Sequence, residues 1–169
     1  GKLGASVHED NPGVNLQMND DIYWNMSTPI IASGFPKSTL DKMETLLQES
    51  DPNDTNPRVR QARGALLKQK SWLSYNERRL RIQAMWEEFF TSFDVLICPV
   101  TFSTAFAHNH EPDLFNRNIT VDGIKRHYSE ITAWPSVATL PQLPSVVIPI
   151  GQNANGLPIG VQIIGPYLE

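Results

Sequence analysis

The stretch LPSVVIPIGQNANGLPIGVQIIGP, residues 143–166, decides the fold class of this chain. Two apolar runs rich in β-branched residues, Ser145–Ile150 and Gly160–Ile164, stand on either side of a loop that carries Asn155-Gly156. Asn-Gly between apolar runs is the strongest short-range turn signal, so the two runs predict adjoining strands. Pro149 has no backbone N–H to donate, and we expect it at a strand end or on an edge strand.

Helical patterns fill the part of the chain that precedes this sheet segment. Residues 1–19 mix Gly, Asn and Pro and predict a loop that joins to preceding sequence. Residues 20–33 place apolar side chains at helical spacing before a candidate C-cap at Gly34. Pro29 falls inside this helix, where proline costs about 3 kcal/mol, so the sequence predicts either a kink or a second short helix. Another helix is predicted from an N-cap at Ser38 to about residue 50.

The longest periodic pattern runs over residues 58–93 and predicts two helices divided near Ser71. One face of the second helix is expected to hold large apolar side chains, namely Leu73, Ile82, Met85, Trp86, Phe89 and Phe93. Such a stripe is far more often core than a cofactor-binding surface, so we expect it to pack against a sheet. Burial of each large side chain is worth roughly 1.5–3 kcal/mol before chain entropy is counted, which makes this helix the main anchor of the core.

Shorter elements are predicted between and after these helices. Residues 51–57, DPNDTNP, are polar and bounded by prolines, which predicts a mobile loop within one domain. Residues 94–99 predict a short buried strand, and residues 118–128 predict a hairpin that turns at Asp122-Gly123. A short helical or irregular passage interrupted by proline is predicted over residues 129–140.

Several of these segments resemble the amidase signature hydrolases, and residues 143–166 look like the closing sheet segment of that family. Residues 86–99, WEEFFTSFDVLICP, are similar to the passage in which a tryptophan-bearing helix feeds a strand that ends in proline. FAHNH at 106–110 and RNITVDG at 117–123 resemble the loop and hairpin of the branch with bacterial amidases and fatty-acid-amide-hydrolase-like enzymes. GPYLE at 165–169 fits the same branch, so the resemblance extends from about Trp72 to the end of the chain.

The resemblance implies an α/β fold, a mixed sheet flanked by helices, in which residues 1–169 form the C-terminal portion of a single amidase domain. It implies a complete enzyme that hydrolyses a carboxamide to a carboxylic acid and ammonia or an amine through a serine acyl-enzyme. No cofactor is implied. The family's catalytic set is one lysine and two serines, and the nucleophile lies in a Gly/Ser-rich signature upstream of the region seen here.

That signature is missing from this chain. The sequence has no Gly-Ser-Ser-Gly run and no Gly-x-Ser-x-Gly run, and its closest pairing, Lys37-Ser38, lies where a helix is predicted to begin. Nucleophile, base and oxyanion donors act as a unit. Loss of the nucleophile costs on the order of a millionfold in kcat in a well-studied serine hydrolase. We therefore assign no catalytic residue to this chain and expect it to be inactive alone.

The loop after the strand predicted at residues 94–99 is a candidate substrate contact. Ligands in α/β sheets tend to bind beyond the carboxyl ends of strands. We therefore predict that Thr101 and Phe102 bind the substrate, with Phe102 as an apolar wall and Thr101 as one polar contact. The alternative is that both residues only shape the loop.

Cys98 and the HNHE cluster at residues 108–111 are the other side chains that could carry chemistry. A cysteine nucleophile needs a nearby base and an electropositive setting, whereas Cys98 closes an apolar run and is predicted to be a small core residue. His108, His110 and Glu111 form an incomplete ligand set without zinc-site spacing, so we predict no metal site.

Charge and composition narrow the choice of partners. The net charge of −4 and pI near 5.5 argue against nucleic acid or an anionic membrane, because both favour a basic face. No apolar run approaches the roughly 20 residues of a membrane span, and a cytoplasmic location is expected. The expected partners are a small-molecule amide and the missing N-terminal part of the enzyme, with a homodimer left open. Open strand edges predict that the isolated chain aggregates or has a partly ordered N-terminus.

Two other functions stay open at this point. One is a non-catalytic amidase-like module that serves as a binding or scaffold piece. The other is an amidotransferase component that acts on mischarged tRNA, although residues 106–110 and the hairpin favour the hydrolase branch. The family often has an Asn-Leu-Thr-Gly-like turn where this chain has Thr139-Leu140-Pro141-Gln142, and this departure leaves the substrate open.

Overall fold

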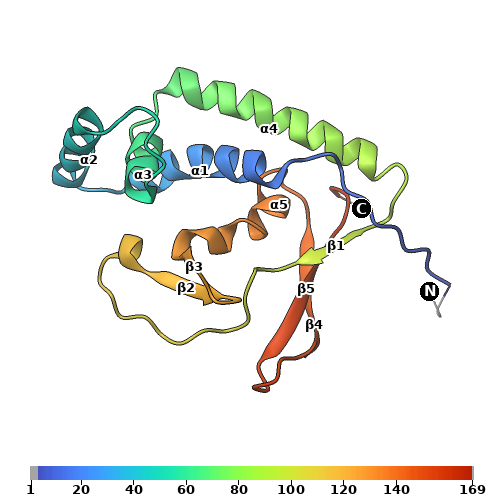
Figure 1. The fold of residues 1–169 in the computed structure, drawn as a ribbon. Coiled ribbons are helices and arrows are strands. Elements are labelled where there is room, and N and C mark those ends of the chain that lie inside the picture. Colours follow the sequence, from blue (N-terminus) through green and yellow to red (C-terminus); the bar gives the residue numbers. More distant parts are fainter. Residues whose placement is uncertain (1–3, 169) are drawn as a thin grey trace.

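Helices lie beside a small antiparallel sheet in the computed structural model, which describes residues 4–168 (Figure 1). The long helices are α1 (Leu16–Ala32), α2 (Lys37–Glu49), α3 (Pro57–Ala65) and α4 (Gln69–Phe89). One sheet has the order β1 (Leu96–Pro99), β5 (Pro158–Ile164), β4 (Ser145–Gln152), and β2 (Asn118–Val121) pairs with β3 (Ile124–His127). Along the chain, the 3₁₀ helix η1 (Leu114–Asn116) precedes β2, and the 3₁₀ helix η2 (Tyr128–Thr132) and the short helix α5 (Pro135–Thr139) follow β3.

The predicted α/β class is confirmed, and the described strands all pair antiparallel. A mixed sheet, as the resemblance implied, is not formed by these residues alone. No helix within residues 4–168 combines the length and the apolar character needed to cross a membrane.

Helix α1 begins earlier than its apolar spacing predicts. Asn15 caps it by accepting a hydrogen bond from Met18 N at 3.0 Å, so the helix starts inside the segment 1–19 that was predicted as a loop. Pro29 lies within one continuous helix, in its last turn, where its missing N–H removes a single helical bond. The helix ends at Ala32 and its C-cap is Ser33, so Gly34 is not the C-cap.

The next helix boundaries also differ from the predicted caps. Pro36, not Ser38, is the N-cap residue of α2, and Ser38 lies in the first turn. Helix α4 starts after Lys68 rather than at Ser71, and it ends at Phe89, which leaves Phe93 outside the helix. Serine is common both at caps and in first turns, so its position alone cannot tell the two apart.

The loop before α3 is tied to that helix. Asn56 accepts a hydrogen bond from Arg58 N at 3.0 Å and so caps α3, with Pro57 as the first helical residue. Arg63 donates to Asp54 O and to Asp51 O, both at 2.7 Å. The mobility of residues 51–57 stays a prediction.

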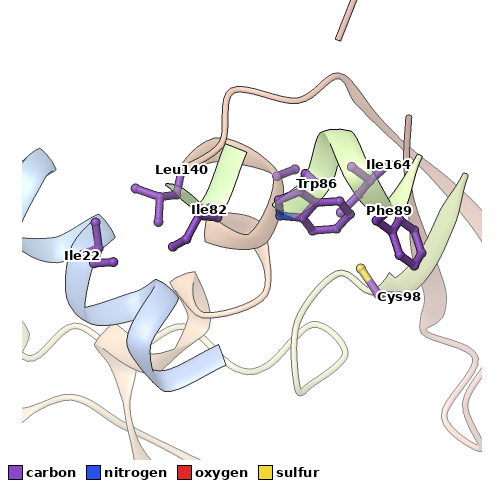
Figure 2. Packing of buried hydrophobic residues seen from close by; sticks show 8 residues of the cluster. Ile22, Ile82, Trp86, Phe89, Cys98, Leu140 and Ile164 are labelled. Carbon is purple, nitrogen blue, oxygen red and sulfur yellow. The ribbon is translucent and has the colours of Figure 1, made fainter. Parts of the chain in front are cut away.

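The core forms where α4 meets the sheet and α1 (Figure 2). Its buried members are Ile22, Ile82, Trp86, Phe89, Cys98, Ala138, Leu140 and Ile164. Trp86 is fully buried, and its ring packs edge-on against Phe89 and stacks on Phe90. The predicted apolar face is thus confirmed at Ile82, Trp86 and Phe89. Leu73, however, is 51% exposed, because it lies near the start of α4, far from the sheet.

The sheet is organised around β5, its central strand. Cys98 of β1 and Val147 of β4 both pair with Gln162. The connection from β4 to β5 is closed by Asn153 N donating to Leu157 O at 2.9 Å, and Gly156 has φ 76°. The predicted Asn-Gly turn is confirmed as a longer loop in which Gly156 takes the left-handed conformation. Pro149 lies on β4, an edge strand among the described residues, where the pairing shifts between Pro149 and Gly151.

Two strands are less covered than their apolar sequences would lead one to expect. In β1 Cys98 is buried but Ile97 is 62% exposed, so residues 94–99 are not a fully buried strand. All eight residues of β4 are exposed. The exposed apolar side chains of β1 and β4 have no packing partner among the described residues.

The second hairpin matches its sequence signal. Residues Asp122 and Gly123 have φ angles of 51° and 78°, the pair of positive angles that a tight two-residue turn requires. After β3, Pro135 occupies the first turn of α5, where a missing N–H costs nothing, and so the predicted interruption becomes a helix start.

Gly64 allows α3 to lie against α1, and we expect Gly64→Ala to destabilise the protein. An added Cβ would lie 2.8 Å from Thr28 Cβ, and Thr28 is itself buried. The helix propensity gain of about 1 kcal/mol is smaller than the strain of a forced helix separation, so we expect a net loss of about 1–2 kcal/mol in the free energy of unfolding. Urea denaturation of the full-length protein measures it.

Gly34→Ala is the control for this substitution. Its added Cβ would lie 3.7 Å from Ile31 O, an ordinary contact, so little change is expected. An unfolding free energy for Gly64→Ala equal to or above that of the parent protein would show that the two helices separate freely.

Candidate functional site

The loop that follows β1 lies between the two hairpins. Asn153, in the loop that joins β4 to β5, donates from Nδ2 to Thr104 Oγ1 at 3.1 Å. On the other side, the guanidinium of Arg126 on β3 lies 5.6 Å from the centre of the Phe102 ring. The structure therefore holds the predicted substrate-binding loop with one contact from each hairpin.

Thr101 and Phe102 differ in their surroundings. Phe102 is half-buried, with the Arg126 cation over its ring face. Thr101 is half-buried as a residue, but its Oγ1 has essentially no accessible surface and no hydrogen-bond partner within the described ranges. Buried hydroxyls usually have a partner, so Thr101 is a polar group whose role is not explained by this part of the chain. Contact of either residue with substrate stays a prediction.

Cys98 lies in the core, as predicted. It is free and buried, and burial raises the pKa of its thiol, with a weak opposing effect from Gln162 Nε2, which donates to Sγ at 3.5 Å. A raised pKa keeps the thiol protonated near neutral pH. Because the thiolate is the reactive form, Cys98 is chemically quiet in the folded protein.

The HNHE segment forms no metal cage in the structure. The rings of His108 and His110 stack with centroids 6.1 Å apart, and both residues are exposed. Within residues 4–168 no three His, Cys, Asp or Glu side chains are grouped so that they could hold a metal ion.

Lys37 and Ser38 do not form a catalytic pair. Lys37 Nζ binds the Asp41 carboxylate at 2.8 Å, one helical turn away, and its side chain is 87% exposed. Both residues lie at the start of α2, which has no buried residue. A lysine that activates a serine must be held close to it and lose its proton, and an exposed ammonium paired with a carboxylate does neither.

Three cavities lie outside the predicted loop, and neither Thr101 nor Phe102 lines any of them. A cavity of about 350 Å³ lies beside the end of α4 and is lined by residues such as Phe90 and Leu143. A wider one of about 950 Å³ lies between the N-terminal segment and β1. The third, about 200 Å³, is lined by Trp24, Thr55, Pro57, Arg60, Phe115, His127, Ser129 and Glu130.

The third cavity collects polar groups that sequence reasoning missed. Arg60 binds Asp20 at 3.0 Å and lies 5.5 Å from the centre of the Trp24 ring. Burial raises the pKa of the Asp20 carboxyl, and the Arg60 charge opposes this. His127 Nδ1 accepts a hydrogen bond from Ser129 N at 3.1 Å and caps η2. The spacing of His127 and Glu130 in a capping box was the one local signal, since the other lining residues come from distant segments.

We expect Cys98 to react with thiol reagents only after unfolding. Burial and a raised thiol pKa both reduce the thiolate available at pH 7–8, so alkylation should be at least about tenfold slower in the folded than in the denatured full-length protein. Mass spectrometry of the peptide that contains Cys98 measures this rate. Equal rates in native buffer and in denaturant would show an accessible thiol.

Comparisons with known proteins agree on one family. The family model Amidase matches residues 2–169. A glutamyl-tRNA(Gln) amidotransferase subunit of Synechococcus sp. (strain CC9311) is 37% identical over 91 residues, 54% of this chain and 17% of that protein. The corresponding protein of Picosynechococcus sp. is 34% identical over 98 residues, 58% of this chain and 18% of that protein. The chain therefore matches less than a fifth of these curated relatives.

Solved structures show the same fold. A bacterial aryl acylamidase of the amidase signature family has a TM-score of 0.64 and 19% identity, covering 97% of this chain and 34% of that one. A glutamyl-tRNA(Gln) amidotransferase subunit of Thermotoga maritima has a TM-score of 0.57 and 18% identity, covering 89% of this chain and 29% of that one. The described residues thus correspond to about a third of each of these structures.

Proposed function

The chain belongs to the amidase signature family, and from this premise we propose that it forms the C-terminal part of an enzyme that hydrolyses a carboxamide through a serine acyl-enzyme. The nucleophile, its lysine and the second serine belong to sequence upstream of this part. The described residues supply sheet core and one side of the substrate cavity. The substrate is a small-molecule amide, and no cofactor takes part.

The uncovered strand β4 is the observation that supports this proposal most directly. Val146, Val147, Ile148 and Ile150 are all between 41% and 60% exposed, and they point to both faces of the strand. A strand that is apolar on both faces is typical of the inside of a larger sheet covered on both sides. The chain is therefore built to be completed by further sheet and helices, as its partial coverage of the related structures also indicates.

Thr101 and Phe102 would then face the substrate cavity of the completed enzyme. They follow the carboxyl end of β1, and Thr101 Oγ1 has no partner within the described part. A hydroxyl can both donate to and accept from an amide, but Oγ1 is shielded by residues of this part of the chain, so this contact would require the loop to move when the enzyme is completed. Phe102 would supply apolar contact to the acyl group.

A tRNA-dependent amidotransferase is the second candidate, and the sequence relatives favour it. The two curated relatives, 34–37% identical over more than half of this chain, carry that name. Such an enzyme also breaks a carboxamide, since an amide nitrogen must leave one molecule before it joins another. Both candidates therefore require the same upstream nucleophile and differ in the acceptor and in their need for partner proteins.

Assays of the full-length protein separate these two functions. We expect a Gly/Ser-rich signature and its lysine upstream, and release of ammonia or amine from simple amides by the purified single polypeptide. Substitution of the signature serine by alanine should reduce kcat on the order of a millionfold. Activity that appears only with glutamine, partner proteins and tRNA would establish the amidotransferase, and absence of the signature would exclude both.

Phe102→Ala tests the substrate contact in that enzyme. We expect kcat/KM to fall about tenfold for substrates with large acyl groups and little for small ones, because about 1–2 kcal/mol of apolar contact is lost. Phe106→Ala is the control, since Phe106 lies in the same loop, packs against Tyr128 and is 46% exposed. Unchanged kcat/KM across acyl chain lengths would remove Phe102 from the cavity.

A further inference from the structure

A buried amide on α1 is held in one orientation. Asn19 is 1% exposed, and its Nδ2 donates to Ser136 Oγ, on α5, at 2.9 Å. Ser136 Oγ donates its single hydrogen to Ala133 O at 2.8 Å, so towards Asn19 this hydroxyl can only accept. The nitrogen of the amide must therefore face Ser136, and the hydrogen-bond network fixes Oδ1 on the other side.

Asn19 Oδ1 lacks the donor that this orientation requires. The oxygen has essentially no accessible surface and no hydrogen-bond partner among residues 4–168. A buried acceptor without a donor is destabilising, and the great majority of such groups bind either protein or an ordered water.

Arg79 on α4 has a buried hydrogen-bond donor that lacks an acceptor. Its Nε donates to Asn76 Oδ1 at 3.0 Å, while its Nη1 has essentially no accessible surface and no partner in the described part of the chain. A guanidinium N–H is a charged donor and is costlier to leave unpaired than a neutral one.

The two groups lie at the same level of neighbouring helices. Helices α1 and α4 run side by side in opposite directions (Figure 1), and Trp72 Nε1 donates to Met26 O at 3.1 Å. Asn19 is seven residues before Met26, and Arg79 is seven residues after Trp72. With about 1.5 Å of rise per residue, both are displaced from that hydrogen bond by about the same length in the same direction.

Asn19 and the residue one turn after Arg79 both bond to the α5 region. Asn19 bonds directly to Ser136 of that helix. Gln83, one turn after Arg79 on the same face of α4, donates from Nε2 to Pro141 O at 2.8 Å, just beyond the end of α5. The unpartnered donor and the unpartnered acceptor thus both belong to the junction of α1, α4 and α5.

We propose that this junction binds one buried water molecule, which accepts a hydrogen bond from Arg79 Nη1 and donates one to Asn19 Oδ1. The ligand must accept on one side and donate on the other. An anion would satisfy Arg79 but be repelled by the amide oxygen, and a metal cation would satisfy the oxygen but be repelled by the guanidinium. Buried waters in proteins commonly make two to four such bonds to otherwise unpaired groups.

The site is independent of the upstream part of the enzyme and of the proposed function. Both atoms are already shielded from solvent by residues of this part of the chain, so added protein could reach them only by displacing what covers them. The bound water would connect α4 to α1, and through Asn19 and Ser136 to α5, whose end leads into β4.

A crystal structure of the full-length protein that shows ordered waters tests the proposal directly. We expect one water within hydrogen-bond distance of both Asn19 Oδ1 and Arg79 Nη1. A direct bond between the two side chains, a partner from the upstream chain, or no ordered water between them would each overturn it.

A double-mutant cycle measures the coupling in solution. Asn19→Leu and Arg79→Met should each destabilise the protein, and together by less than their separate effects predict, with a coupling of about fivefold in the equilibrium constant of unfolding. Arg78→Met replaces Arg79→Met in the control cycle, because Arg78 is half exposed and its guanidinium lies near Asp21, 3.8 Å away. That cycle should be additive within about twofold.

If the effects on the free energy of unfolding were as additive for Asn19 with Arg79 as for Asn19 with Arg78, a water bridge between Asn19 and Arg79 would be contradicted. If a variant does not fold, the crystal structure of the parent protein still decides the matter.

Discussion

The burial of Trp86 is the interaction on which the rest of the structure depends. Its indole is fully enclosed where α4 crosses β5 and β1, with Phe89 beside it and Ile164 from the central strand in the same cluster (Figure 2). An aromatic side chain of this size removes more apolar surface from water than the other members of the core. Its Nε1 has no hydrogen-bond partner among the described residues. The cost of that N–H is smaller than the gain from enclosing the ring, and so packing rather than hydrogen bonding sets the position of α4 on the sheet.

The sequence predicted those features of the fold that depend only on residues adjacent in the sequence. The turn at Asp122-Gly123 and the loop with Gly156 follow from backbone angles that few residue types adopt, and both are present. Helix ends were predicted less well, because serine, asparagine and proline each suit several positions near a cap. Asn15 caps α1 by accepting from Met18 N, a contact that the helical pattern does not contain, while Pro36 precedes α2 without a side-chain capping bond. Leu73 was predicted to be buried from spacing alone, but burial depends on what lies opposite, and at that end of α4 Trp72 contacts α1 while Leu73 stays 51% exposed.

The candidate site could be predicted only in part, because contacts between residues that are far apart in the sequence leave no local pattern. Position after a strand was enough to select Thr101 and Phe102, and the structure adds the Arg126 contact and the unpartnered hydroxyl. The cavity with Trp24, Arg60 and His127 could not be predicted, since its walls are separated by about a hundred residues and only the capping box of His127 and Glu130 gave a local signal. Cys98 shows the opposite case, in which an apolar run was sufficient to predict a buried, unreactive thiol.

Unsatisfied groups in this chain fall into two kinds, and they call for two different partners. Apolar side chains of β4 and Ile97 of β1 are open to solvent, so additional protein can cover them, and their position at the sheet edges is where the proposed upstream part would attach. Asn19 Oδ1 and Arg79 Nη1 are closed to solvent, so additional protein cannot reach them without opening the helix junction. A partner for these atoms must already be enclosed when α1, α4 and α5 come together. The helix junction can therefore be complete before the sheet is, which makes it the part of this chain whose packing depends least on the proposed upstream portion.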